Sequence, residues 1–283
     1  MNDSLDLDRV YQALGFRCAP FRITPDTSFF FPHGQYLAAL GHLRYGVMSG
    51  GVTLLTGEVG LGKTLLCRCF MRQMSTQNVR TAYVFNPQQG YADLLAALYR
   101  DLTGHSAPAD TPEGALHDLL YRTLIDFAQQ RTRVALIVDE AHALSPELLE
   151  GLRLISNLET EENKLISLML FGQNELEDTL ALPSMRALRQ RISIWHRLRP
   201  FGWMETAEYV QHRTNNARVT GNFRFSHAAL LAARHYSKGV PRRINQICDR
   251  AVLLAFARGH HEVRLAMLRE AAHEVLGLAP MPH

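Results

Sequence analysis

The chain has 283 residues, of which 47% are apolar and 20% are charged, with 30 Lys and Arg against 27 Asp and Glu. This length fits one large domain or two smaller ones, and the apolar fraction is sufficient for a sizeable buried core. The modest charged fraction argues against long disordered tails. The net charge of +3 is too small to indicate a nucleic-acid-binding protein by itself.

The sequence also predicts where the protein resides. No apolar run approaches the roughly 18 residues that a membrane span requires, and the first ten residues are polar and acidic, unlike a secretory signal. The four cysteines, Cys18, Cys67, Cys69 and Cys248, lack the spacing of a metal site or redox motif. They are expected to be free thiols in a reducing compartment, so a cytoplasmic location is predicted.

Helices and strands are predicted to alternate up to about residue 200, after a Pro-rich and aromatic loop that runs from Pro20 to Pro32. The patterns predict, in chain order, a helix over 33–48, a strand over 52–56, a helix through 67–74, a strand over 79–85, helices near 91–102 and 112–130, a strand over 134–138, a helix from 146 to about 157, and strands over 165–171 and 192–198. Strands that are apolar on both faces and alternate with helices indicate a parallel sheet covered by helices.

The strand patterns disappear after Pro200, and the remaining sequence predicts helices over 204–216, 227–236, 241–258 and 263–276. We therefore expect a segment 1–50 that belongs to the α/β domain, an α/β core over 51–200 and a small all-helical domain over 201–283. The helical part carries 11 Lys and Arg against 6 Asp and Glu, a net charge of +5. This surplus indicates either a solvated helical surface or a patch for an anionic partner.

A phosphate-binding loop directly follows the strand at 52–56. Residues Gly57, Glu58, Val59, Gly60, Leu61, Gly62, Lys63 and Thr64 match G-x-x-x-x-G-K-[ST], with an apolar strand before them and a helix after them. The glycines would let backbone N–H groups surround a triphosphate, and the helix N-terminus adds partial positive charge. Lys63 is expected to reach the β- and γ-phosphates and Thr64 to ligate Mg²⁺. The predicted nucleotide-binding segment extends to Leu65.

Two carboxylates, Asp139 and Glu140, end the apolar strand near 134–138. Asp139 is expected to hold Mg²⁺, and Glu140 to orient and polarise the attacking water. His142 completes the letters DEAH, but the chain has one phosphate loop and is too short for two tandem motor domains, so a helicase is not indicated. His142 is expected to be a surface residue at a helix start or a polar contact behind the catalytic carboxylate.

With these two motifs placed, the chain resembles the AAA+ ATPases of the ExeA/GspA/MshM group from about Tyr11 to Leu276. The resemblance implies a P-loop sheet domain followed by a helical lid. It rests on an ordered set of segments: Pro20-Phe21 with Thr24-Pro25-Asp26 and Phe29-Phe30, Leu55 to Gly60 with Gly62 to Thr64 and Leu66 to Arg68, Val138 to His142, Leu152 to Glu159, Phe171 to Leu176, Arg189 to Ile192, and Gly239 to Asn245.

The resemblance assigns roles to residues that spacing alone leaves unexplained. Gln173 would be the sensor that faces the γ-phosphate. The family usually has Pro where this chain has Asn174, and because Asn is a common sensor in other AAA+ proteins, Gln173 and Asn174 compete for the role. Asn86 would hold Glu140 inactive until a partner binds, or it is a plain turn residue before Pro87.

Three arginines also receive roles from the resemblance. Arg189 and Arg191 lie in the region of the arginine finger, which would point into the nucleotide of a neighbouring subunit, although Arg186, Arg197 and Arg199 are nearby. Arg242 would be the second sensor, reaching from the helical lid onto the nucleotide. Residues 21–32 either pack their aromatic side chains against the core or cover the adenine ring.

The resemblance implies an oligomeric ATPase that uses ATP and Mg²⁺, with slow turnover by the isolated protein because the finger is supplied by a neighbour. The absence of a membrane helix and of a peptidoglycan-binding domain predicts a short, MshM-like member. Its expected role is assembly of a type IV pilus of the mannose-sensitive haemagglutinin kind, or of a type II secretion apparatus, at the cytoplasmic face of the inner membrane through a membrane-protein partner.

Two alternatives stay open at this stage. One is a duplex-DNA-binding ATPase that selects target sites for transposition, which the net charge of +5 and the arginines at 186–199 would favour. The other is a scaffold whose bound nucleotide only sets its oligomeric state.

Overall fold

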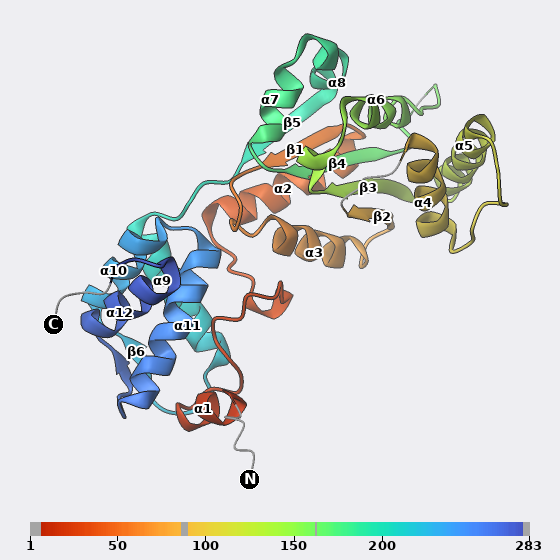
Figure 1. Cartoon of the computed structure of the whole chain (residues 1–283). Coiled ribbons are helices and arrows are strands. Elements are labelled where there is room, and N and C mark those ends of the chain that lie inside the picture. The colour runs from red at the N-terminus through yellow and green to blue at the C-terminus, as the bar shows by residue number, and fades with distance from the viewer. Residues whose placement is uncertain (1–6, 86–89, 162, 280–283) are drawn as a thin grey trace. The chain divides into compact units, whose positions relative to one another are not determined.

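The computed structural model describes residues 7–85, 90–161 and 163–279. The chain divides into two compact units (Figure 1). One unit comprises Pro32–Val59 and Lys63–Leu198. The other comprises the described residues up to Phe31, the three residues Gly60–Gly62, and the described residues from Arg199 onward.

A five-stranded parallel sheet forms the centre of the first unit, as predicted. Its strands are β1 (Val52–Thr56), β2 (Val79–Phe85), β3 (Arg133–Asp139), β4 (Ser167–Gly172) and β5 (Ile192–Arg197), in the order β2-β3-β4-β1-β5. Every residue of β1 and β4 is buried, which explains why these strands are apolar on both faces. The carboxyl ends of the strands meet at one edge of the sheet.

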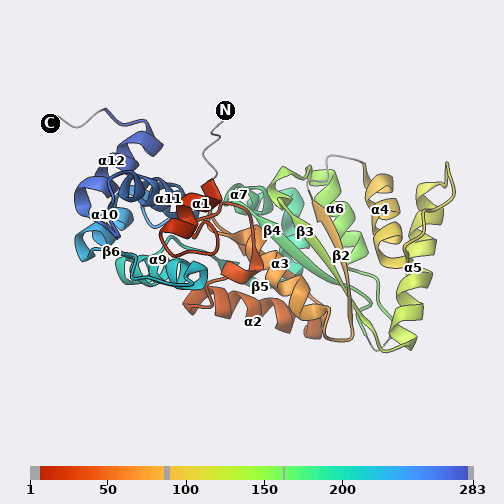
Figure 2. The same cartoon turned by 90° about the horizontal axis from the view of Figure 1, so that it is seen from below.

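Helices cover both faces of this sheet (Figures 1 and 2). On one face lie α2 (Gly34–Ser49) and α3 (Lys63–Met74), and on the other lie α4 (Tyr91–Thr103), α5 (Glu113–Gln129) and α6 (Pro146–Ile155). Leucines of α4, α5 and α6 form a continuous core with β1, β3 and β4. On the α2 face, Gly46 permits close approach, because a Cβ there would lie 2.1 Å from the Thr53 hydroxyl oxygen.

Between β4 and β5 the chain forms short helices that the sequence patterns did not predict. They are α7 (Glu175–Ala181), a 3-10 turn (Pro183–Met185) and α8 (Arg186–Arg191). Each is too short for a clear helical period. Arg191, the last residue of α8, directly precedes the first residue of β5.

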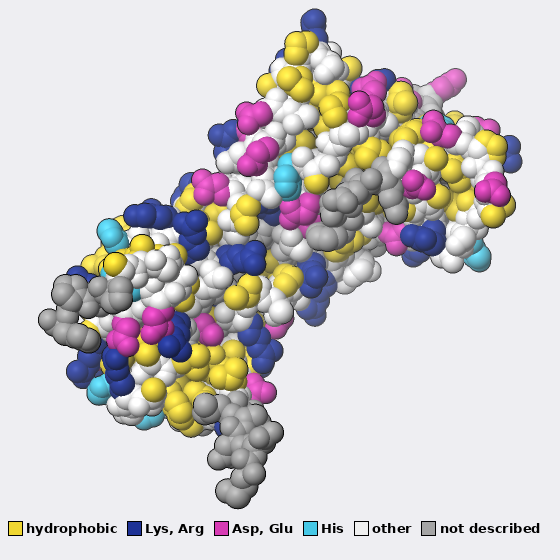
Figure 3. Space-filling model, in the orientation of Figure 1, with side chains coloured by type: hydrophobic (Ala, Val, Ile, Leu, Met, Phe, Trp, Pro, Cys, Tyr) yellow, Lys and Arg dark blue, Asp and Glu magenta, His cyan; other side chains and the backbone are white. Residues whose placement is uncertain are grey.

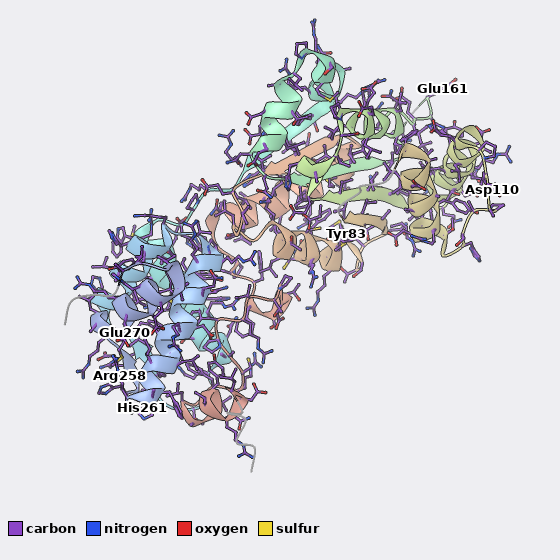
Figure 4. The ribbon with its side chains drawn as sticks, in the orientation of Figure 1. Tyr83, Asp110, Glu161, Arg258, His261 and Glu270 are labelled. Carbon is purple, nitrogen blue, oxygen red and sulfur yellow. The ribbon has the colours of Figure 1, made fainter. Side chains whose placement is uncertain are left out.

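The second unit is mainly helical. It contains α1 (Leu7–Ala13), α9 (Trp203–Ala217), α10 (His227–Ser237), α11 (Pro241–Ala257) and α12 (Leu265–Leu276), with the two-residue strands β6 (Arg224–Phe225) and β7 (Glu262–Val263) paired in parallel. Figure 4 labels Arg258 and Glu270, whose ion pair joins the end of α11 to α12: one guanidinium nitrogen, Nη2, donates to both carboxylate oxygens, at 2.8 and 2.7 Å. The small ladder between β6 and β7 is an addition to the predicted all-helical domain.

Residues 20–31 pack onto α9 within this second unit, whereas the sequence analysis placed them with the α/β domain. Phe29 and Phe31 are buried, which confirms their expected packing role. Arg213 of α9 is also buried, and it donates to the carbonyl oxygens of Pro20 at 2.7 Å and Arg22 at 2.8 Å. Its guanidinium lies over the Phe29 ring, 4.5 Å from the centroid. Because these carbonyl oxygens and the Phe29 ring contact Arg213 of α9, residues 20–31 belong to the helical unit.

Basic and acidic side chains of the helical unit lie close to one another at several places. Figure 3 shows Lys and Arg side chains interspersed with Asp and Glu on the face in view. Among the described residues of this unit, five arginines form ion pairs with carboxylates: Arg199 with Glu205, Arg224 and Arg264 with Glu262, Arg250 with Glu274, and Arg258 with Glu270. None of the described helices is long and apolar enough to cross a membrane.

Candidate functional site

The glycine-rich loop turns the chain from the carboxyl end of β1 into α3. Gly60 and Gly62 have φ values of +85° and +88°, a conformation that disfavours residues with a side chain. Helix α3 begins at Lys63, directly after the loop. The N–H groups of its first turn therefore have no intrahelical partners and are available to an anion.

Lys63 is buried against this loop. Its ammonium group donates to the carbonyl oxygens of Gly57 at 2.6 Å and of Glu58 at 3.0 Å. Burial lowers the pKa of Lys63, and the negative charges of Glu140, Asp139 and Glu175 oppose that shift. The lysine is thus a cation placed between the loop and a group of carboxylates.

Asp139 ends β3 and is fully buried. Its Oδ2 atom accepts hydrogen bonds from the Thr64 hydroxyl at 2.9 Å and the Tyr83 hydroxyl at 3.2 Å. Its Oδ1 atom accepts from the backbone N–H of Glu140 at 3.0 Å. The structure therefore brings Thr64 and Asp139, the two predicted metal ligands, into direct contact.

Tyr83 is a member of the site that sequence reasoning missed (Figure 4). It lies on β2, the strand next to β3. Burial raises the pKa of Tyr83, and the negative charge of Asp139 raises it further. The hydroxyl is therefore protonated at neutral pH and acts as a donor. The available signal was a tyrosine two residues before the end of an apolar strand, which is too common a pattern to identify a site.

Glu140 has a left-handed backbone, with φ 55° and ψ 35°. For a residue other than glycine this conformation costs on the order of 1–2 kcal/mol, so the surrounding structure must hold it in place. The Glu140 side chain is about one-third exposed, and its Oε2 atom lies 3.4 Å from Nδ1 of His142. The carboxylate thus reaches solvent, unlike that of Asp139.

The chain after β4 contributes Gln173, whose Nε2 atom lies 2.8 Å from Nε2 of His142. Gln173 therefore joins the group formed by Glu140 and His142. Asn174 is exposed at the N-terminal cap of α7 and makes no side-chain capping hydrogen bond. His142, which the sequence analysis expected to be a surface residue or a polar contact, lies between Glu140 and Gln173. Asn86 falls outside the described residues.

Arg242 lies in the first turn of α11, and its backbone N–H donates to the carbonyl oxygen of Gly60 at 3.2 Å. A Cβ on Gly60 would lie 2.9 Å from the Cβ of Arg242 and 3.0 Å from a methyl carbon of Val240. The tip of the glycine-rich loop, Gly60–Gly62, therefore packs on the start of α11 and belongs to the same compact unit.

Arg189 and Arg191 lie apart from this group of residues. Arg189 is exposed and donates to the carbonyl oxygen of Ala181 at 3.5 Å, and Arg191 is half-buried. Because Arg191 immediately precedes β5, and β5 runs parallel to β1 with Ile192 opposite Val52, both arginines lie at the amino edge of the sheet. Lys63, Asp139 and Gln173 lie at the carboxyl edge.

Comparison with known proteins identifies the kind of domain that this chain carries. Residues 47–180 match a family model described as an AAA domain. General secretion pathway protein A of Aeromonas hydrophila is 39% identical over 270 residues, which cover 94% of this chain and 48% of that protein. Residues 47–180 of the chain thus carry an AAA domain, and the chain is similar over most of its length to the ExeA/GspA family. It spans about half the length of this curated relative.

Solved structures share the fold at low sequence identity. Cdc6p from Pyrobaculum aerophilum has a TM-score of 0.68 at 19% identity, over 91% of this chain and 72% of that chain. The Aeropyrum pernix ORC1 protein, in complex with DNA, has a TM-score of 0.65 at 19% identity, over 90% and 69% of the two chains. The Thermotoga maritima RuvB branch migration motor has a TM-score of 0.58 at 18% identity, over 86% and 70%. The predicted AAA+ fold is confirmed.

Substitution of Gly60 by alanine tests the packing at the loop tip. Gly259 is the matched control, since its φ is also positive, at +68°, but a Cβ there would meet nothing within 4 Å. Each substitution should cost about 1–2 kcal/mol in free energy of unfolding because alanine is strained at positive φ. Gly60→Ala should cost more, since its Cβ must displace Arg242 and Val240. Equal losses in urea titrations of the two variants would contradict the packing described for this loop.

Proposed function

We propose that this chain is an ATPase that binds and hydrolyses ATP with Mg²⁺ as a homo-oligomer. Its proposed role is to support a type II secretion apparatus or the assembly of a type IV pilus of the mannose-sensitive haemagglutinin kind. The observation that carries the ATPase proposal is the contact between the Thr64 hydroxyl and the Asp139 carboxylate, 2.9 Å apart, beside a glycine-rich loop and the buried ammonium of Lys63.

The residues present fit a magnesium ion. Mg²⁺ prefers oxygen ligands and usually keeps several waters, so a hydroxyl and a carboxylate next to a phosphate site are a sufficient protein contribution. Thr64 and Asp139 supply these two oxygens and would hold the ion. When bound, Mg²⁺ would neutralise charge on the β- and γ-phosphates.

The other residues divide the remaining tasks. Lys63 would exchange its two loop carbonyls for phosphate oxygens and stabilise their charge. Glu140, which is near solvent, would orient a water molecule for in-line attack and accept its proton. Gln173 would donate its amide N–H to the γ-phosphate, with Asn174 as the competing candidate. Arg242 would act as the second sensor, and the loop segment Gly57 to Leu65 would surround the nucleotide.

Arg189 and Arg191 are proposed as the arginine finger of a neighbouring subunit. Both lie at the amino edge of the sheet, next to the start of β5. The five residues of β1 separate that edge from the loop, and a strand rises about 3.3 Å per residue. An arginine side chain is too short to bridge such a distance to its own nucleotide, which supports action in a second subunit.

The cellular role rests on the similarity to general secretion pathway protein A. We propose that the chain acts in the cytoplasm, at the inner membrane through a membrane-protein partner. Duplex DNA is the alternative partner, supported by the net charge of +5 over 201–283. The ion pairs and mixed charges of the helical unit give this alternative less support, because a DNA-binding face requires arginines free to meet phosphates.

Two substitutions test the proposed chemistry. Lys63→Ala should abolish ATP binding, because the site loses its buried cation, whereas Glu140→Gln should bind ATP normally and lose turnover by at least about a hundred-fold. Fluorescence titration with a labelled ATP analogue and a phosphate-release assay measure the two effects. Wild-type turnover by Glu140→Gln would show that another group activates the water.

A mixing experiment tests the finger. The double variant Arg189→Ala, Arg191→Ala should bind ATP but lose about 10³-fold or more in turnover. Adding Glu140→Gln subunits should restore activity, because they supply intact fingers to neighbours that retain Glu140. Wild-type turnover per subunit should also rise with protein concentration.

No recovery on mixing, together with turnover that is independent of dilution, would argue against a shared site. Mass photometry of Glu140→Gln with ATP·Mg²⁺ gives the oligomeric state. Assemblies that grow only on added duplex DNA would favour the alternative partner.

A further inference from the structure

Two polar side chains, those of His142 and Gln173, form a line with the proposed catalytic carboxylate of Glu140. Glu140 follows β3, His142 lies in the 3-10 turn Ala141–Ala143, and Gln173 follows β4. The His142 ring lies between the other two, with Nε2 2.8 Å from Gln173 Nε2 and Nδ1 3.4 Å from Glu140 Oε2. All three residues belong to the α/β unit.

The chemistry of the Gln173 contact decides which atom donates and which accepts along this line of side chains. An amide nitrogen donates and does not accept, so the Nε2 atom of His142 accepts the proton of Gln173. In a neutral imidazole the proton is then on Nδ1, on the side of the ring that faces Glu140. In each contact a donor therefore faces an acceptor: the Gln173 amide faces Nε2 of His142, and the Nδ1–H group of His142 faces the Glu140 carboxylate.

The Nδ1 atom of His142 is buried and makes no hydrogen bond in this structure. Glu140 Oε2, at 3.4 Å, is within ion-pair range but does not meet hydrogen-bond geometry. A buried donor left without a partner costs about 1–3 kcal/mol. A small movement of the Glu140 side chain would complete the bond and remove that cost, so the contact is close to a second, hydrogen-bonded arrangement.

The backbone holds the ring in place. The amide of Ala143 donates to the Glu140 carbonyl at 2.9 Å, which closes the turn around the left-handed Glu140. Gly172 precedes Gln173, and a Cβ there would lie 3.4 Å from the backbone nitrogen of His142 and 2.6 Å from the Leu176 side chain. The end of β4 therefore packs closely on the turn that carries His142.

We propose that His142 is a positioning residue that couples Gln173 to Glu140. The amide of Gln173 carries two protons, so it can donate one to His142 and the other to the γ-phosphate. Binding of the phosphate then fixes the amide, the amide fixes the ring, and Nδ1–H holds Oε2 of Glu140. Oε1 remains free to accept the proton of the attacking water. The inference rests on the proposed ATPase function.

Two substitutions of His142 separate this role from simple packing. His142→Leu fills similar volume without polar atoms, whereas His142→Asn is smaller but places an amide donor near the position of Nδ1. If His142 positions Glu140, the leucine variant should lose about ten- to a hundred-fold in kcat and the asparagine variant should retain more. If the ring only fills space, leucine should be the better replacement.

Affinity for a fluorescent ATP analogue should stay within a few-fold of wild type in both variants, which also shows that they are folded. His105→Ala is the control, because His105 is an exposed residue of the same unit. Gln173→Ala, alone and combined with each variant, completes a double-mutant cycle. The loss from His142→Leu should shrink markedly when Gln173 is already alanine.

Additive losses in the cycle, or kcat of His142→Leu equal to or above that of His142→Asn, would overturn the proposal. If His142→Leu does not fold, the cycle with His142→Asn still tests the proposal. Coupling requires that the loss of kcat caused by His142→Asn be smaller when Gln173 is already alanine. Failure of the ATPase function itself would look different. Wild type would then show no turnover at high concentration, or Glu140→Gln would turn over normally.

Discussion

The buried carboxylate of Asp139 is the constraint on which the site depends. A carboxylate removed from water must find donors, and here it finds three: the Thr64 hydroxyl, the Tyr83 hydroxyl and the Glu140 amide. These donors come from α3, from β2 and from the residue after β3. One side chain therefore fixes the start of the helix after the glycine-rich loop relative to the central strands. The hydroxyl of Thr64 is placed next to the carboxylate by folding alone.

The neighbouring carboxylate has the opposite environment. Glu140 is partly exposed, stands on a left-handed backbone, and faces His142 at a distance just beyond a hydrogen bond. Asp139 is suited to holding a cation, because it is fixed and dry. Glu140 is suited to handling water, because its carboxylate is near solvent. Two adjacent acidic residues thus receive different tasks from burial and backbone conformation rather than from their own chemistry.

The sequence predicted the parts of this molecule that depend on local pattern. Two segments were predicted in this way: the strand, glycine-rich loop and helix at Val52 to Met74, and the apolar strand that ends in Asp139. Each has its own hydrophobic pattern and turn residues. We expected the two to lie together because the carboxyl ends of parallel strands share one edge of the sheet. The contact of Tyr83 was missed, and for His142 a polar contact behind the carboxylate was one of two alternatives, without Gln173 as the partner. Each contact depends on which strands are neighbours and on the register between them. The sequence patterns around both residues occur in many proteins, so they do not identify a site.

The sequence analysis placed residues 20–31 in the α/β domain because their tertiary partners cannot be identified from local sequence. Phe29 and Phe31 indicate burial, but nothing local specifies the surface against which they pack. That surface is formed by Arg213 and its neighbours on α9, nearly two hundred residues later. Long-range partners of this kind are decided by tertiary packing, which also explains why the short helices α7 and α8 carried no signal of their own.

The most direct test of the account is the magnesium dependence of nucleotide affinity. A fluorescent ATP analogue would be titrated with and without Mg²⁺ into wild type, Asp139→Asn and Thr64→Val. If the Thr64–Asp139 pair holds the ion, Mg²⁺ should tighten binding by wild type and have little effect on either variant, while binding without metal stays similar in all three. Equal tightening by Mg²⁺ in wild type and both variants would show that the metal lies elsewhere and would contradict the assigned site.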